Sequence, residues 1–363
     1  MTFTVPGLWP RIRDAGMATV AVMGMAKNTG KTVALNHLLA CAARERAGVG
    51  LTSIGRDGED LDAVFSIPKP PVVVWPGTVV ATARDTLLRA RVRTRMLAGT
   101  GIASPMGEIV LVKALDHGDM EVAGASRSVD QIRTIELLRR CGAERVFLDG
   151  ALGRSQHASP AVADGVLLAT GAAVGGGLGD VLRKTRDRLA ILGLPALEGA
   201  ARAHCAPLFD AGTGVGLWAR DGSPIWQADI ASLNAAEALL ERAAGHDIGL
   251  VAVTGAVGRR LWRAFDALAE RHPGLQVVVA DGTRLFVDAA ELAVLQQRGA
   301  RVAAWRAIRL AGVTTNPFSP LGGHLDATEL RDAARAAFPD HAVHDVVLEE
   351  PTFQDHRHGP VAA

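Results

Sequence analysis

The 363-residue chain lacks the features by which disulfide-rich, zinc-binding and acyl-hydrolase proteins are usually recognised. Its three cysteines, Cys41, Cys141 and Cys205, are far apart and form neither a Cys-x-x-Cys pair nor a Cys/His pattern. A disulfide framework or a structural zinc site is therefore not expected, and a reducing cytoplasm is the predicted location. The Gly-x-Ser-x-Gly pattern of acyl hydrolases is absent as well, so that chemistry is not supported.

An excess of one charge and long apolar runs are also missing. The 39 basic residues nearly balance the 38 acidic ones, so no overall field would attract nucleic acid or an anionic membrane. No stretch reaches the roughly 18 uncharged apolar residues that a membrane-spanning helix needs. Arg11, Arg13 and Asp14 precede the first apolar run, which argues against a signal peptide. The expected partners are proteins or small molecules, with neither nucleic acid nor a membrane among them.

What the chain does contain is an alternation of short apolar runs with longer helical patterns. The first run, 18–23, leads into a glycine-rich loop and then into a helical pattern over 31–47. This alternation predicts an α/β fold with a mainly parallel sheet that helices cover on both faces. Further strands are predicted at 50–54, 72–74, 108–113, 145–148 and 165–169, and helices at 85–98 and 128–141, the latter with Ser128 as N-cap.

A change of rhythm near residue 170 predicts a domain boundary. The segment 171–179 is rich in glycine, and a basic helical stretch over 180–192 follows it. Strand and helix patterns then alternate again as far as residue 348. We therefore predict a first α/β domain over 1–170, a second α/β domain over 171–348 and a loosely held tail over 349–363.

The segment Gly-Met-Ala-Lys-Asn-Thr-Gly-Lys-Thr at residues 24–32, called here the glycine loop, follows an apolar strand and opens a helix. Phosphate oxygens need converging backbone N–H donors, which a glycine-rich turn at a helix N-terminus supplies together with the positive end of the helix dipole. The loop thus predicts a P-loop nucleotide triphosphatase (NTPase) domain over 1–170 that binds ATP, or a relative, with Mg²⁺. Lys31 is expected to reach the β and γ phosphates and Thr32 to ligate Mg²⁺. The remaining predicted nucleotide-binding residues are Gly24, Lys27, Asn28, Thr29 and Gly30.

The spacing of the loop is Gly-x5-Gly-Lys-Thr, one residue longer than the usual motif. It is the spacing seen in dethiobiotin synthetase, so the chain resembles that branch of P-loop proteins. Lys27 has two interpretations: a second charge over the phosphates, as in the deviant loops of dimeric ATPases, or a solvated lysine. By analogy with this branch, whose members often work as dimers, a homodimer is a further expectation.

Phosphoryl chemistry also needs carboxylates that hold Mg²⁺ or its waters. Asp149 ends an apolar run and precedes Gly150, so we predict that it is a Mg²⁺ ligand at the carboxyl end of a strand, with an ordinary turn aspartate as the alternative. Asp57 and Glu59 follow the second strand and should lie at the same edge, where open α/β sheets bind ligands. We predict a Mg²⁺ or catalytic role for Asp57 and a catalytic role for Glu59.

Several segments together resemble the ATP-binding (KamB-like) subunit of the factor that reactivates adenosylcobalamin-dependent lysine 5,6-aminomutase. The glycine loop is shared with many NTPases, whereas the ordered set of later segments is more specific. The matching segments span most of the chain and are 24–32, 52–59, 69–70, 77–78, 148–151, 158–160, Asp164, 170–172 and 315–320.

The resemblance implies an ATPase that works with a companion reactivase subunit on a cobalamin-dependent aminomutase, so that damaged cobalamin leaves and intact coenzyme enters. The sequence lacks the Asp-x-His-x-x-Gly signature of a cobalamin-binding module, so the client enzyme is expected to hold the coenzyme. The second domain is assigned to client or partner contact. Two alternatives stay open: a dethiobiotin synthetase-like ligase or kinase that acts on a small carboxylic acid, and a nucleotide-binding module with negligible turnover.

Overall fold

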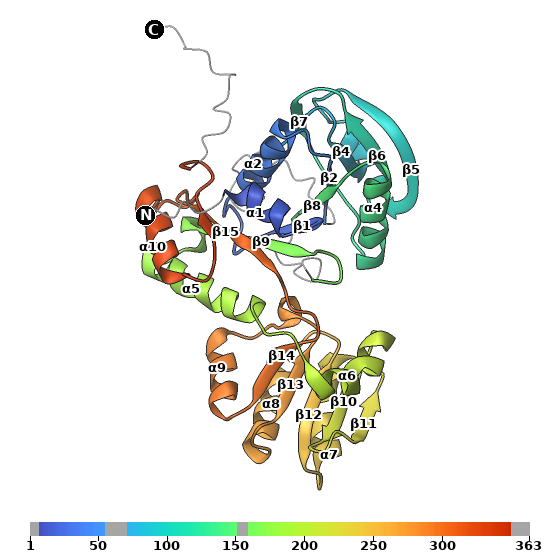
Figure 1. The fold of residues 1–363 in the computed structure, drawn as a ribbon, viewed down its shortest axis with the longest axis vertical. Coiled ribbons are helices and arrows are strands. Elements are labelled where there is room, and N and C mark those ends of the chain that lie inside the picture. Colours follow the sequence, from blue (N-terminus) through green and yellow to red (C-terminus); the bar gives the residue numbers. More distant parts are fainter. Residues whose placement is uncertain (1–6, 55–70, 151–158, 350–363) are drawn as a thin grey trace. The chain divides into compact units, whose positions relative to one another are not determined.

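The computed structural model describes residues 7–54, 71–150 and 159–349, and its internal packing divides the chain into two compact units. Unit 1 comprises Met1–Ala158, Val162–Lys184 and Leu310–Ala363, and unit 2 comprises Ser159–Ala161 and Thr185–Arg309. Unit 2 is therefore an insertion within unit 1, and each unit is described by itself (Figure 1).

This division differs from the predicted boundaries at residues 170 and 348. Residues 171–184 and 310–349 belong to unit 1, because the last two strands of the chain, β15 (Leu310–Asn316) and β16 (Val343–His344), pair with its sheet and not with a second one. The change of rhythm near residue 170 precedes the start of the main part of unit 2 at Thr185, and the chain returns to its first sheet after unit 2.

Unit 1 is built on a nine-stranded sheet in the order β16-β15-β9-β1-β8-β2-β4-β6-β5. Only the β4–β6 and β6–β5 pairs in it are antiparallel, so the predicted α/β fold with a mainly parallel sheet is confirmed. The strands not yet given are β1 (Thr19–Gly24), β2 (Val49–Ser53), β4 (Val79–Ala83), β5 (Thr94–Ser104), β6 (Gly107–Ala114), β8 (Arg145–Asp149) and β9 (Gly165–Gly171); β3 (Val72–Val74) and β7 (Gly118–Met120) form a separate ribbon.

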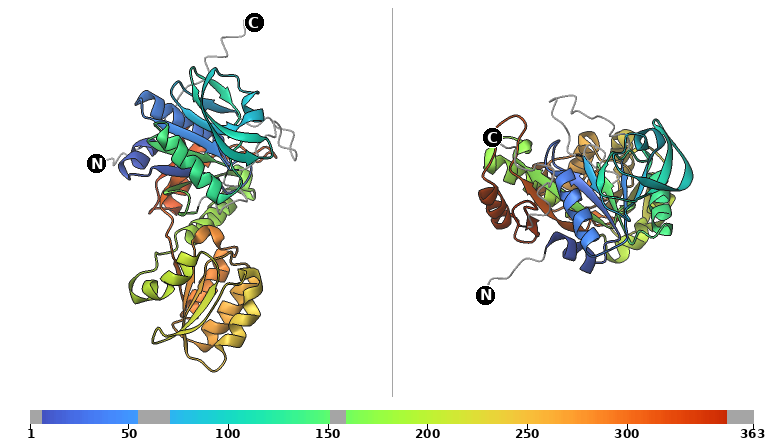
Figure 2. Two further views of the ribbon diagram at one scale, coloured as in Figure 1. Left: turned by 90° about the vertical axis from the view of Figure 1, so that its right-hand side faces the viewer. Right: turned by 90° about the horizontal axis from the view of Figure 1, so that it is seen from above.

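Two helices cover opposite faces of the central strands (Figure 2). Leu35 and Leu38 of α2 (Lys31–Arg44) share a core with Val22 of β1. On the other face, α4 (Ser128–Arg140) lies so close to Gly50 that a Cβ there would be 3.3 Å from the Cβ of Leu138. The remaining helices of unit 1 are α1 (Leu8–Asp14), α3 (Arg84–Leu87), α10 (Ala327–Ala337) and the first part of α5 (Gly177–Leu192).

Two local predictions are wrong. The helix expected over 85–98 is limited to the short α3, and the long strand β5 begins at Thr94. Pairing with β6 across a turn at Gly107, whose φ is +88°, overrides the helical spacing of the leucines. Ser128 is not an N-cap either, because it is already the first helical residue of α4 and Arg127 occupies the cap position.

Unit 2 has a five-stranded sheet in the order β11-β10-β12-β13-β14, in which the last three strands are parallel. One face packs on α7 (Ala235–Ala243), α8 (Arg259–Arg271) and α9 (Ala289–Gln297), and the other on α6 (Gly199–Ala211). The strands are β10 (Val215–Ala219), β11 (Pro224–Ala228), β12 (Ile248–Val253), β13 (Gln276–Val279) and β14 (Arg301–Ala304). A second α/β unit is thus confirmed, and its helices, like those of unit 1 within the described ranges, are too short or too polar to cross a bilayer.

Candidate functional site

The glycine loop leaves the sheet at the carboxyl end of β1, an interior strand of unit 1 (Figure 1). β1 lies between β8 and β9, with Val22 in register with Asp149 and Gly24 in register with Ala169. The amide of Met25 donates a hydrogen bond to the Ala169 carbonyl at 2.8 Å. The loop therefore starts at the edge where parallel sheets bind ligands, with a strand on either side to hold it.

The backbone of the loop has two residues in the left-handed region, which anion-binding turns also use. Asn28 and Gly30 have φ angles of +61° and +85°, in the left-handed region that brings successive N–H groups onto one concave side. α2 begins at Lys31, its N-cap Gly30 makes no side-chain cap bond and its first turn has no acidic residue. The first N–H groups of this helix thus receive no side-chain acceptor from the cap position, which is the arrangement that favours a bound anion.

Lys31 folds back over the start of the loop. A Cβ added to Gly24 would lie 2.9 Å from Lys31 Nζ and 2.7 Å from Thr29 Oγ1, so only glycine admits the ammonium group at this point. The hydroxyl of Thr29 donates to the Ala26 carbonyl at 3.0 Å and keeps the turn closed. The structure therefore brings Gly24, Thr29, Gly30 and Lys31 together, as predicted for a phosphate site, while Lys27 is exposed.

Asp149 ends β8 on the face of the sheet that α2 covers. Residues in register on parallel strands point to the same face, and Val22, Asp149 and Ser53 are in register. Val22 packs with α2, as does Phe147, two residues before Asp149. Asp149 is only 3% exposed. Its carboxylate is therefore buried on the face of the sheet that is covered by α2, the helix whose first turn contains Thr32. A Mg²⁺ ligand would need to be on this face.

Several buried polar atoms around this edge have no hydrogen-bond partner among the described residues. They belong to the loop, to β2 and to α4, and comprise Asn28 Nδ2, Thr52 Oγ1, Ser53 Oγ and Gln131 Oε1. Because a buried polar atom without a partner costs about 1–3 kcal/mol, a group of them at one strand edge fits a site that a polar ligand completes.

The residues fit a magnesium nucleotide. Mg²⁺ bound with phosphates takes only one or two protein oxygens and keeps waters, which the Thr32 hydroxyl and the Asp149 carboxylate can supply. Within the described ranges no group of three or more His, Cys, Asp or Glu residues is placed to hold a metal, but an ion that arrives with phosphates does not need one. Asp57 and Glu59 lie outside the described residues, so their roles stay predictions.

Sequence reasoning missed two contributors to this edge. Asn316, the last residue of β15, donates from Nδ2 to the Asn28 carbonyl at 2.8 Å, and Ser53 lies in register with Asp149. The segment 315–320 is one of the segments that carry the resemblance, but nothing in it indicated a contact with the glycine loop.

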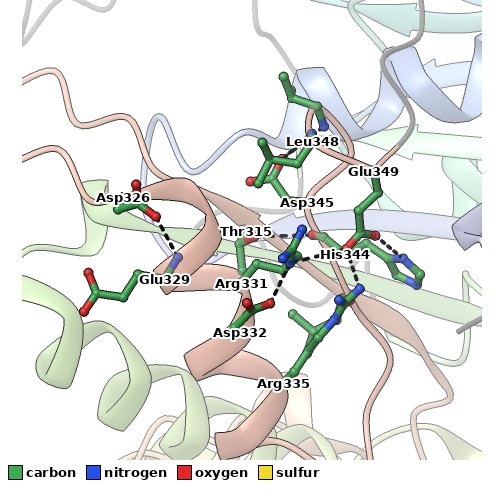
Figure 3. A network of polar contacts seen from close by, with 12 residues as sticks. Thr315, Asp326, Glu329, Arg331, Asp332, Arg335, His344, Asp345, Leu348 and Glu349 are labelled. Atoms are coloured by element: carbon green, nitrogen blue, oxygen red, sulfur yellow. Dashed lines mark hydrogen bonds and ion pairs between the residues drawn. The ribbon is translucent and has the colours of Figure 1, made fainter. Parts of the chain in front are cut away.

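A second polar cluster in unit 1 joins α10 to β16 (Figure 3). Glu349 lies between Arg335 and His344, whose Nδ1 is 3.2 Å from Glu349 Oε2. Arg335 also donates to the Val343 carbonyl at 3.1 Å. Burial lowers the pKa of His344. These ion pairs fix the end of the described chain, while His344 Nε2 and Asp345 Oδ2 are buried without a hydrogen-bond partner among the described residues.

A buried polar cluster of unit 2 centres on Asp281, which follows β13 and is 2% exposed. Its carboxylate accepts hydrogen bonds from Ser159 Oγ at 2.6 Å and from the Thr283 amide at 2.8 Å. The hydroxyl of Thr283 donates to it as well, and Arg284 Nε lies 4.0 Å away. Asp281 is therefore saturated from within unit 2, which suits a structural role.

Comparisons of the chain with protein-family models, with curated proteins and with solved structures found no match.

Proposed function

We propose that this protein is a cytoplasmic Mg²⁺-dependent ATPase that works with a companion subunit to reactivate a cobalamin-dependent aminomutase. The observation that carries the ATPase part is the geometry of the glycine loop. Its left-handed residues, the helix start without a side-chain cap and the Lys31 ammonium over Gly24 lie beside the buried carboxylate of Asp149. The client and the companion subunit rest on the resemblance of the ordered sequence segments.

The chain's own groups would divide the work of phosphoryl transfer between them. Lys31 and the backbone N–H groups of the loop would balance the charge of the β and γ phosphates, while Thr32 and Asp149 would offer oxygen ligands to Mg²⁺. When bound, ATP supplies a γ-phosphoryl group whose bond to the bridging oxygen breaks as a water oxygen bonds to phosphorus. Asp57 and Glu59 are the predicted residues for orienting that water.

The coupling to a client would follow from two arrangements of the nucleotide site. If a partner surface binds one arrangement better than the other, nucleotide turnover shifts the balance between them and changes the client. Unit 2 is the proposed contact surface, because the groups expected to carry out the chemistry belong to unit 1.

The test is steady-state ATP hydrolysis by the full chain with Mg²⁺, alone and with an aminomutase that has been inactivated by turnover, while mutase activity is followed. We expect recovery that requires ATP and is lost in Lys31→Ala. Because the client assignment includes a companion subunit, the assay is run with and without that subunit.

The outcomes separate the proposal from its alternatives. Stoichiometric conversion of a small carboxylic acid, without recovery of the mutase, would favour the ligase or kinase that the Gly-x5-Gly-Lys-Thr spacing also fits. ATP binding without turnover or recovery would leave a nucleotide-binding module. Failure of the wild-type chain to bind any nucleotide would overturn the proposal as a whole.

A further inference from the structure

The glycine loop is held from outside its own strand and helix by Asn316. This residue ends β15, which is separated from β1 by β9. Its side-chain Nδ2 donates to the Asn28 carbonyl at 2.8 Å, and its Oδ1 accepts from the Phe318 amide at 3.3 Å. Both ends of the Asn316 amide are thus engaged, and the bond from the Phe318 amide orients the side chain independently of the loop.

Two glycines make this approach possible. A Cβ on Gly171, the register partner of Asn316 on β9, would lie 2.0 Å from the Asn316 carbonyl oxygen. A Cβ on Gly30 would lie 3.0 Å from the Cβ of Asn316. Asn316 therefore packs against the turn of the glycine loop itself, in a space that any larger residue at Gly171 would occupy.

The hydrogen bond from Asn316 to the Asn28 carbonyl also affects the direction of the Thr29 N–H donor. The peptide unit that joins Asn28 to Thr29 is planar, and its C=O and N–H point in opposite directions. When Asn316 holds the Asn28 carbonyl, it also fixes the direction of the Thr29 N–H. Without that bond, rotation of this peptide would turn a carbonyl oxygen, which repels phosphate, toward the side from which an anion is bound.

We propose that Asn316 is a positioning residue of the nucleotide site, which fixes the 28–29 peptide plane and so aims the Thr29 N–H at a phosphate group. This inference rests on the proposed nucleotide-binding function and adds to it a residue 288 positions away in the chain. Asn316 acts here on the phosphate end of the ligand, and it makes no contact with the nucleoside.

The test compares Asn316→Ala and the nearly isosteric Asn316→Asp with wild type in the full chain. Amide hydrogen exchange of residues 24–32 is measured without nucleotide, and affinities are measured for Mg-ATP and for magnesium tripolyphosphate. We expect faster exchange and a loss of about 3- to 10-fold in affinity for both ligands with Asn316→Ala, from the loss of one hydrogen bond. The Asp variant should lose more, because a carboxylate cannot donate to a carbonyl and repels phosphate.

Asn36→Ala is the matched control. Asn36 also donates to one backbone carbonyl, that of Pro71, and accepts from one backbone amide, that of Val73, but it does so away from the glycine loop. It should leave both affinities and the exchange of residues 24–32 unchanged.

Weaker binding of Mg-ATP with unchanged tripolyphosphate binding would overturn the inference, since Asn316 would then contact the nucleoside. Wild-type exchange and affinities in Asn316→Ala would overturn it too, while leaving the proposed function intact. If the wild-type chain binds neither ligand, the proposed function itself fails, which is a different and recognisable result.

Discussion

Units 1 and 2 use the same local architecture for different purposes. Each has parallel strands whose carboxyl ends lead through glycine-containing loops into helices, and α2 and α8 both begin after a glycine that makes no side-chain cap bond. At the start of α8, Arg259 lies 3.6 Å from Glu291 and Arg260 lies 2.5 Å from Glu237. Unit 2 thus supplies its own counter-charges at this helix start, and a ligand has little to add there.

The two units also differ in the polar atoms that surround their buried aspartates. Asp281 of unit 2 receives hydrogen bonds from Ser159 and Thr283. Near Asp149 of unit 1, by contrast, the polar atoms Ser53 Oγ and Asn28 Nδ2 have no partner among the described residues. Fold alone therefore does not mark a site. Around Asp281 one buried atom, Arg284 Nε, also has no hydrogen-bond partner among the described residues, so the difference lies in the several such atoms that unit 1 gathers at one strand edge.

The strongest test of this comparison is to truncate the side chain of the first residue of α2 and of α8. Lys31→Ala should reduce ATP hydrolysis on the order of 10²- to 10³-fold, because the positive charge that stabilises the transferred phosphoryl group is lost. Arg259→Ala removes the equivalent cation from α8 and should leave hydrolysis within about 2-fold of wild type. Steady-state kinetics of both variants check this, and a similar loss in the two would show that unit 2 also takes part in phosphate binding.

Exchange of each buried aspartate for asparagine should give opposite results. Asp149→Asn should weaken Mg²⁺-dependent nucleotide binding roughly 10- to 100-fold, as expected for a disturbed metal site. Asp281→Asn should leave that affinity unchanged but lower the free energy of unfolding by about 2 kcal/mol, because donors buried around it lose their acceptor. Calorimetric titration and urea denaturation separate the effects, and a stability loss without a binding loss in Asp149→Asn would make it an ordinary turn aspartate.

Two hydroxyl deletions sharpen the contrast on a smaller scale. Ser53→Ala removes a buried oxygen that has no hydrogen-bond partner among the described residues. It should raise the free energy of unfolding by about 0.5–1 kcal/mol while weakening Mg-ATP binding. Thr283→Val removes a hydroxyl that donates to Asp281 and should lower that free energy by about 1 kcal/mol without any effect on binding. Equal destabilisation in urea denaturation would mean that Ser53 is already satisfied in the folded protein.

The smallest expected effect is a dependence of the stability of unit 1 on pH. Burial lowers the pKa of His344, so the unfolded chain takes up the proton first as the pH falls below the ordinary histidine value of about 6.5. Stability is then complete above that pH and decreases as the pH falls toward the lowered pKa. The protection factors of amides, which correct the exchange rates for their intrinsic decrease at lower pH, should fall between pH 7.5 and 5.5 more in β15 than in β12, and His344→Asn should remove part of this difference.

The sequence alone was sufficient to predict the elements that depend on local patterns. The strand over 19–24, the glycine loop and the helix from Lys31 follow one another directly, so periodicity and turn chemistry identify all three. The unit boundaries could not be found in this way, because β15 joins β9 only after unit 2 intervenes. The helix predicted over 85–98 failed for the same reason, since pairing with β6 decides the conformation of β5.

The candidate site shows the same limit. Lys31, Thr32 and Asp149 could be identified because each ends or follows a recognisable element. The contact of Asn316 with Asn28 could not, because it depends on the order of three strands and on the missing side chain of Gly171. Ser53 is likewise an ordinary strand residue until the register places it beside Asp149.

The link between Asn28 and Asn316 also sets an order of events during protein synthesis. The two residues are 288 positions apart, and ribosomes add about 5–20 residues per second, so roughly 15–60 seconds separate their synthesis. Throughout that interval the growing polypeptide carries a glycine loop without its hydrogen bond from Asn316. This bond can form only after all of unit 2 has been translated, so the completion of the loop waits for the insertion.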